Sequence, residues 1–255
     1  MKKKDEGTEI NVMEVTKGVI EFNILGMSPL IYNAMSNKVK EGLLLPAPKK
    51  NAAEKASSLK HNPLAEFRSS TYSLKDDTAL TFLAIPATAF KGCLCSAALD
   101  MPGASKSQIG RLTYVEGDMI ALYGVPKLKM DVVRMADMSH TPDIRTRAIV
   151  PAWACKVVIS FVKPLLREQA VINLLAAGGI TQGVGDFRPQ KGKGSYGQFK
   201  IVAENDLEYL KIIKAGVRKA QLKAMENPEF YDVESEELYH FYEVETKRRG
   251  FKVAA

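Results

Sequence analysis

The residues best suited to chemistry in this chain lie between positions 177 and 199, in a glycine-rich segment. The segment contains seven glycines, three cations and three aromatic residues. Glycine lets a backbone adopt positive φ and approach a ligand closely, arginine and lysine donate hydrogen bonds to anions, and aromatic rings offer stacking faces. Together these properties predict contact with a phosphate-bearing chain. The predicted contact residues are Gly183, Gly185, Phe187, Arg188, Lys191, Lys193 and Tyr196.

The sequence around this segment excludes the common nucleotide-binding loops. Its glycines lack the GxGxxG spacing, and Lys191 is followed by Gly192 rather than by the serine or threonine of a Walker loop. Those loops also run from a strand into a helix, whereas a helical pattern over residues 167–177 precedes this segment, with Gly178 as its predicted C-cap. The segment is therefore predicted to join a helix to a strand. The simplest alternative is that it is only a connector.

Charge is unevenly distributed along the chain. The 255 residues carry a formal net charge of +7. Residues 1–203 hold 27 Lys and Arg against 18 Asp and Glu, a net charge of +9, and residues 204–255 hold nine against eleven. A basic surface attracts anionic partners such as nucleic acid. The hydrophobic content of 46% is ample for the core of one large domain or two small ones.

Several classes of protein are excluded by the composition. No run of about 18 apolar residues is present, so we expect no membrane span. The first lysines are not followed by an apolar stretch, which argues against a secretory signal and favours a cytoplasmic protein. Cys93, Cys95 and Cys155 form neither an even set nor a Cys-x-x-Cys pair, so we expect buried thiols rather than disulfides or structural zinc. No cofactor or metal ion is expected.

Hydrophobic patterning predicts strands and helices in alternation. Alternating apolar residues indicate strands, and apolar residues at three- and four-residue spacing indicate helices. The predicted strands cover residues 17–26, 79–85, 111–115, 119–123, 127–135, 148–162 with a break at Pro151, and 196–202. The predicted helices cover residues 87–99, 167–177 and 204–227. In the last helix the expected core positions are Leu207, Leu210, Ile213, Val217 and Ala220, and Trp153 is also expected in the core.

Two polar stretches interrupt these elements. Residues 33–62 contain six lysines and two glutamates with little periodicity, and form a basic insert in which Lys49 and Lys50 are predicted contacts. Residues 131–147 form a second, thumb-like insert. Its Arg145 and Arg147 are either phosphate contacts or partners in structural salt bridges. The predicted organisation is a core over residues 1–203, with a helix and tail over residues 204–255 packed on it.

The order of the main elements predicts a ferredoxin-like fold of the α+β class. With the inserts set aside, the elements follow the order β-α-β-β-α-β. The predicted architecture is an RRM-like sheet with two helices on one face and an extra C-terminal helix. In RNA-recognition domains, the open face of such a sheet binds single strands.

Two local motifs resemble the RAMP superfamily, the RNA-binding subunits of CRISPR effector complexes. Residues 85–98, which include Lys91 and Gly92, are similar to the Ile-Pro-x-Ser-x-Lys-Gly-x-Leu-Arg-x-Ala opening of that superfamily's first helix, although Cys95 replaces the arginine. Residues 183–197 are similar to its terminal Gly-x-Gly-x-Arg-x-x-Gly-x-Gly loop, with an unusual Asp186. The motifs cover a small part of the chain. The resemblance implies single-stranded RNA, or DNA, as the partner and a homo-oligomer or filament assembled along the strand, in a stand-alone protein of phage or mobile-element type.

Catalysis has one candidate loop, and we assign no catalytic residue. Asp137, His140 and Asp143 lie within seven residues and are the residue types of a ribonuclease, with or without a metal ion. Their spacing matches no known metal-binding loop. His61 and His240 are isolated in the sequence and are interpreted as surface or structural histidines. A further alternative is an interaction protein that imitates or inserts into a CRISPR-type complex.

Overall fold

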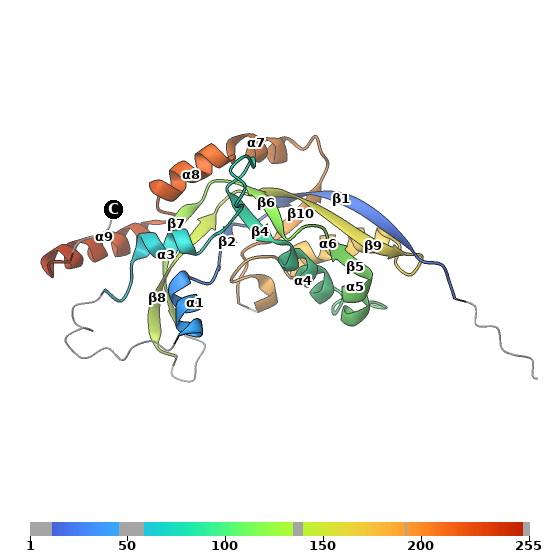
Figure 1. Cartoon of the computed structure of the whole chain (residues 1–255), viewed down its shortest axis with the longest axis horizontal. Helices are drawn as coiled ribbons and strands as arrows, with labels where there is room; N and C mark the ends of the chain where they lie inside the picture. Colours follow the sequence, from blue (N-terminus) through green and yellow to red (C-terminus); the bar gives the residue numbers. More distant parts are fainter. Residues whose placement is uncertain (1–11, 46–58, 135–139, 192, 252–255) are drawn as a thin grey trace, which may run out of the picture.

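The computed structural model describes residues 12–45, 59–134, 140–191 and 193–251 (Figure 1). These residues form an α+β protein with antiparallel sheets, so the predicted class is confirmed. The strands are β1 (Thr16–Gly26), β2 (Leu30–Ile31), β3 (Tyr72–Ser73), β4 (Leu83–Pro86), β5 (Thr113–Val115), β6 (Met119–Tyr123), β7 (Lys127–Arg134), β8 (Pro142–Val150), β9 (Ala154–Lys163) and β10 (Phe199–Val202). The helices are α1 (Asn37–Leu44), α3 (Pro63–Ser69), α4 (Ala87–Ala97), α5 (Lys106–Leu112), α6 (Glu168–Thr181), α7 (Leu207–Ala215), α8 (Arg218–Glu226), α9 (Val233–Arg248) and the 3-10 turn η1 (Pro189–Lys191).

The larger sheet holds the centre of the fold. Its seven strands follow the order β10-β1-β9-β6-β4-β3, and β5 pairs with β9 beside this path. β1 and β9 pair along nearly their whole lengths and form the long central ribbon of Figure 1. Because side chains alternate between the faces of a strand, Phe22 and Ile24 of β1 enter the main core whereas Leu25 faces the opposite side.

Helices cover both faces of this sheet. α4 and α6 pack together on one face. Their buried apolar residues have the spacing that places side chains on one side of a helix, and include Phe90, Leu94, Val171 and Leu175. α7 lies on the opposite face, where Tyr209 and Ile212 pack against Leu25 (Figure 1). In addition to the pair of helices α4 and α6 on one face, the sheet therefore has a third helix, α7, on the opposite face.

The helix before the glycine-rich segment is longer than predicted. Gly178 does not cap it, because α6 continues to Thr181 and its C-cap is Gln182. Gly178 instead lies where α6 crosses α4, and a Cβ at this position would lie 2.8 Å from the Cys93 Sγ. The glycine therefore allows the two helices to approach closely.

The predicted strand over residues 148–162 is two strands in two different sheets. β8 ends at Val150 and belongs to the three-stranded sheet β2-β8-β7, whereas β9 begins at Ala154 in the larger sheet. Trp153 lies between them with no exposed surface, as expected for a core residue, and its Nε1 donates to the Ser28 carbonyl oxygen at 2.8 Å. The break predicted at Pro151 is therefore the passage between the sheets.

Both polar inserts contain regular structure. Residues 33–62 include α1, and Lys49 and Lys50 lie outside the described residues. β7 and β8, which extend into residues 131–147, pair as two antiparallel strands, from Lys127↔Ile149 to Arg134↔Pro142. The strand predicted at residues 79–85 begins only at Leu83, and α5 takes the start of the strand predicted at residues 111–115.

The helix predicted over residues 204–227 is wrong in its continuity and in its buried face. It divides into α7 and α8, with Gly216 as the C-cap of α7. Within α7, Leu207 is 84% exposed and Leu210 is 45% exposed, whereas Ile213 is partly buried, so the buried side of this helix is turned from the predicted one. The buried residues of the two helices are Tyr209, Ile212, Gln221 and Met225. The tail that follows forms α9, which packs on β7.

Candidate nucleic-acid interface

The two motifs singled out in the sequence meet around one cavity, which we call the helix–loop cleft. It has a volume of about 300 Å³ and lies between α4, the start of α5 and the glycine-rich segment. Gly92 opens directly onto free space, because a Cβ built there would meet nothing within 4 Å. The lining residues are Thr88, Ala89, Gly92, Cys95, Ser96, Lys106, Val184, Gly185, Arg188 and Gln190.

The helix–loop cleft is positively charged. Lys106 and Arg188 line it, and no carboxylate is among its lining residues. Lys91 lies close by on α4 and is half-buried. Burial raises the pKa of the Cys95 thiol, and the positive charges of Lys91 and Lys106 act in the opposite direction. Both ammonium groups therefore act on the same wall of the cleft, where an anion would be stabilised.

Arg188 is held in place by the loop that carries it. Its Nη1 donates to the Gly185 carbonyl oxygen at 2.7 Å, and its Nε and Nη2 donate to the Gln190 Oε1 at 2.9 and 2.7 Å. The Gln190 Nε2 donates in turn to the Ser96 Oγ of α4 at 2.8 Å. A guanidinium carries more donors than these contacts use. Arg188 is therefore positioned beside α4 with donors left for a ligand.

The other predicted contacts of the segment are at its surface. Lys191 and Lys193 are exposed, and neither is ion-paired within the described part of the chain. The rings of Phe187 and Tyr196 lie 6.1 Å apart between centroids at an interplanar angle of 41°. Phe187 is 46% exposed. Gly183 is buried inside the turn, so it shapes the loop rather than offering surface.

Asp186 ties the glycine-rich segment to the smaller sheet. Its carboxylate forms an ion pair with the guanidinium of Arg147 on β8, and its backbone N–H donates to the Ile31 carbonyl oxygen at 2.9 Å. Arg147 is only 9% exposed, and its Nη2 also lies 3.8 Å from an oxygen of Asp131. Arg147 was considered either as a phosphate contact or as a partner in a structural salt bridge. The protein supplies Asp186 as the partner for the salt bridge.

We expect Arg147→Met to lower the free energy of unfolding by about 2–3 kcal/mol, because removing one partner of a largely buried ion pair leaves the other uncompensated. Urea denaturation followed by fluorescence measures this change. Arg145→Met is the matched control, since Arg145 is exposed on the same strand and should change stability by less than about 0.5 kcal/mol. Equal stability of the two variants would contradict the assigned role of the pair.

Arg145 lies away from the helix–loop cleft. It lines a separate cavity of about 620 Å³ between β8 and the insert of residues 33–62, together with Lys60, His61 and Asp143. The structure therefore divides the predicted contacts into two groups. Gly185 and Arg188 line the helix–loop cleft, and Lys91 acts on its Cys95 wall, whereas Arg145 and Arg147 line the other cavity.

His61 stands alone in the sequence but has two carboxylate partners in the structure, which agrees with its interpretation as a structural histidine. Its Nδ1 lies 3.0 Å from an oxygen of Glu66, and its Nε2 lies 3.2 Å from an oxygen of Asp143. The Lys60 Nζ donates to the same Asp143 oxygen at 2.7 Å, and this hydrogen bond holds the pKa of the Asp143 carboxyl below its usual range. His61 and Asp143 are 82 residues apart, so no local pattern signals their contact. Asp137 of the candidate catalytic loop lies outside the described residues.

None of the helices within the described ranges has the length and hydropathy that crossing a membrane requires. In the same ranges, no three His, Cys, Asp or Glu side chains are grouped so as to hold a metal ion.

Comparison with known proteins gives only weak structural likeness. No protein-family model matches the chain, and no curated protein matches it. Among solved structures, the chain is similar to the crystal structure of Cmr6 from Pyrococcus furiosus, with a TM-score of 0.34 and 10% sequence identity. The match covers 73% of this chain and 99% of that one. At this score the likeness carries no conclusion about function, which is argued below from the chain's own residues.

Proposed function

We propose that this protein binds single-stranded RNA, with the helix–loop cleft as its principal contact to the phosphate backbone. The observation that carries the proposal is the convergence of cations from two distant parts of the chain on one cavity. Lys106 of α5 and Arg188 of the glycine-rich segment line this cavity, and no carboxylate does. Lys91 adds a third cation beside it. Proteins that bind single strands combine such a basic groove with exposed aromatic rings.

The arrangement of the central strands supports a ferredoxin-like core as the finer description of the fold. β10, β1, β9 and β5 are neighbours in that order. In the chain, α4 lies between β1 and β5, and α6 lies between β9 and β10. Together these elements follow the β-α-β-β-α-β order. We propose on this basis a RAMP-like core over residues 1–203, with residues 204–255 packed on it.

Assembly along the strand is the second part of the proposal. The paired strands β7 and β8 extend from the body of the protein beside α3 and α1 (Figure 1). They include most of the thumb-like insert expected from the sequence. In a homo-oligomer, this hairpin is the element that would reach a neighbouring copy on the same RNA.

A titration of a fluorescent 30-mer RNA tests the proposal. We expect binding at micromolar protein or tighter in low salt, and an affinity that falls steeply with salt because phosphate contacts release counterions. A 30-base-pair RNA duplex and a 30-mer single-stranded DNA serve as comparisons. The proposal fails if the single-stranded RNA gives no anisotropy change. RNA recovered from the complex should be intact on a gel, whereas shortened RNA would favour the ribonuclease alternative.

A further inference from the structure

A second cavity lies at the end of α5, whereas the helix–loop cleft lies at the start of this helix. The second cavity has a volume of about 370 Å³, in the range of small-ligand sites. It is built by the start of β1, the end of α5, β5 and β9. The lining residues are Val15, Thr16, Lys17, Arg111, Leu112, Thr113, Tyr114, Ser160, Phe161 and Val162.

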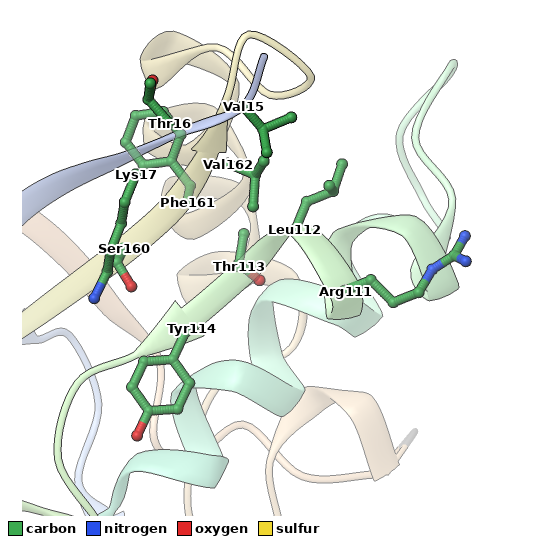
Figure 2. Close-up of a pocket in the computed structure, with 10 residues that line it drawn as sticks. All are labelled: Val15, Thr16, Lys17, Arg111, Leu112, Thr113, Tyr114, Ser160, Phe161 and Val162. Atoms are coloured by element: carbon green, nitrogen blue, oxygen red, sulfur yellow. The ribbon is translucent and has the colours of Figure 1, made fainter. Parts of the chain in front are cut away.

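The lining of this cavity is mainly apolar, with one exposed ring at its end. Figure 2 shows Val15, Val162 and Leu112 around the centre and the ring of Tyr114 below them. Tyr114 is 51% exposed although it lies on a strand, because its neighbours Thr113 and Val115 take the buried side of β5. An exposed tyrosine beside an apolar hollow gives both a stacking face and a space for a flat ring.

The charges around the cavity favour an anionic chain. Lys17 is paired with Glu116 at 2.7 Å, and the hydrogen bond from Lys17 lowers the pKa of the Glu116 carboxyl, so this pair is neutral as a whole. Arg111 is exposed and is not ion-paired within the described residues. No carboxylate lines the cavity itself. The net charge of the residues around the cavity is therefore positive, with the Arg111 side chain extending outward from the hollow in Figure 2.

α5 connects this cavity to the helix–loop cleft. Lys106 at the first position of α5 lines the cleft, and Arg111 and Leu112 at its end line the second cavity. With seven residues, the helix is about 10 Å long. Lys106, like Arg111, has no ion-pair partner in the described ranges. An RNA strand that leaves the cleft along α5 would therefore pass from the Lys106 ammonium to the Arg111 guanidinium, neither of which has an ion-pair partner in the described residues.

We infer that the cavity beside Tyr114 is a nucleobase-binding subsite, in which a base of the bound single strand stacks on the Tyr114 ring while Arg111 contacts its phosphate. This inference rests on the proposed function. The subsite takes any base, because stacking on a ring requires no particular hydrogen-bond pattern. The Tyr114 side chain lies on the face of the sheet opposite the one that α4 and α6 cover, since its neighbours Thr113 and Val115 are buried on the other side of β5.

The experiment uses 30-mer RNA with 2-aminopurine at successive positions, and the full chain. We expect wild-type protein to quench the probe at one or more positions and Tyr114→Leu to restore its emission. Tyr114→Leu should also raise the Kd for RNA fivefold or more with an unchanged salt slope, since the lost group is neutral. Tyr114→Phe keeps the ring and should behave as the wild type. Arg111→Ala should instead reduce the salt slope by about 0.7.

The outcomes separate this inference from the proposed function. If the wild type binds RNA but Tyr114→Leu has the same Kd and the same quenching, the subsite is wrong and the proposed function remains. If the wild type does not bind RNA, both fail. Thermal unfolding checks that Tyr114→Leu is folded, and its Tm should lie close to that of the wild type because the replaced side chain is half exposed.

Discussion

The double variant Arg188→Ala/Lys191→Ala should bind a 30-mer RNA about 30- to 100-fold more weakly than the wild type. Arg188 faces the helix–loop cleft and Lys191 is exposed beside it. Each lost charge-assisted contact is worth about 1–1.5 kcal/mol, which gives this factor when two are removed. The slope of log Kd against log salt should fall by about 1.4, because two phosphate contacts to a single strand are lost. Fluorescence anisotropy at several salt concentrations measures both quantities.

Two controls make this result specific. Lys211→Ala removes an exposed lysine of α7 that lines neither the helix–loop cleft nor the cavity beside Tyr114, and should bind RNA like the wild type. Arg188→Gln keeps a side-chain donor for the Gly185 carbonyl oxygen and separates loss of charge from disturbance of the loop. The loss should be similar for RNAs of different sequence, since phosphate contacts carry no base information. A loss confined to one sequence would contradict a backbone contact.

Gln221→Ala should be among the most destabilising single substitutions in the chain, at about 3–5 kcal/mol. The side chain of Gln221 has no exposed surface and its amide joins three segments of backbone. Its Oε1 accepts from the backbone N–H groups of Phe82 and Leu83 at 2.7 and 2.9 Å. Its Nε2 donates to the carbonyl oxygens of Leu122, Gly124 and Gly216 at 2.8, 3.0 and 2.9 Å. Alanine removes this partner from all five groups, of which the Gly216 carbonyl oxygen still accepts from the Gly124 N–H at 3.2 Å. Each buried group left without a partner costs about 1–3 kcal/mol before relaxation.

Chemical denaturation of Gln221→Ala gives the free energy directly, and a fall in Tm of about 10 °C should accompany it. Gln169→Ala is the matched control, because Gln169 is an exposed glutamine whose side chain bonds only Asn173 on the same helix surface. That variant should stay within about 0.5 kcal/mol of the wild type. Comparable free energies of unfolding for the two variants would show that the hydrogen bonds of Gln221 do not stabilise the fold.

Local patterns in the sequence predicted α4 and the glycine-rich segment of the cleft, but not α5, which carries Lys106. The helix at residues 87–99 is α4, and the central strand pair appears at the predicted residues 17–26 and within 148–162. These predictions succeed because apolar periodicity reports directly on which side of an element is buried. The assigned contacts of the glycine-rich segment remain predictions, and the structure adds that Arg188 and α4 share one cavity.

The features that the sequence did not predict depend on contacts between distant residues. In α7 the leucine spacing assigned Leu207 and Leu210 to the core, whereas Tyr209 and Ile212 are buried there, and the pattern was also continued across Gly216, where the helix breaks. Gln221 was not recognised because a polar residue in a helix is usually exposed. Asp186 is explained only by Arg147, which is 39 residues away. Such pairs have no local signature because the fold alone brings them together.

The passage between the two sheets provides a natural spectroscopic probe. Trp153 is the sole tryptophan of the sequence, and it lies at the point where β8 becomes β9. Its backbone carbonyl oxygen accepts from the Gly26 N–H at 2.9 Å, where β1 also leaves the larger sheet. Both chain crossings therefore converge on one indole ring. Selective excitation of that ring would follow the separation of the two sheets in real time, without any added label.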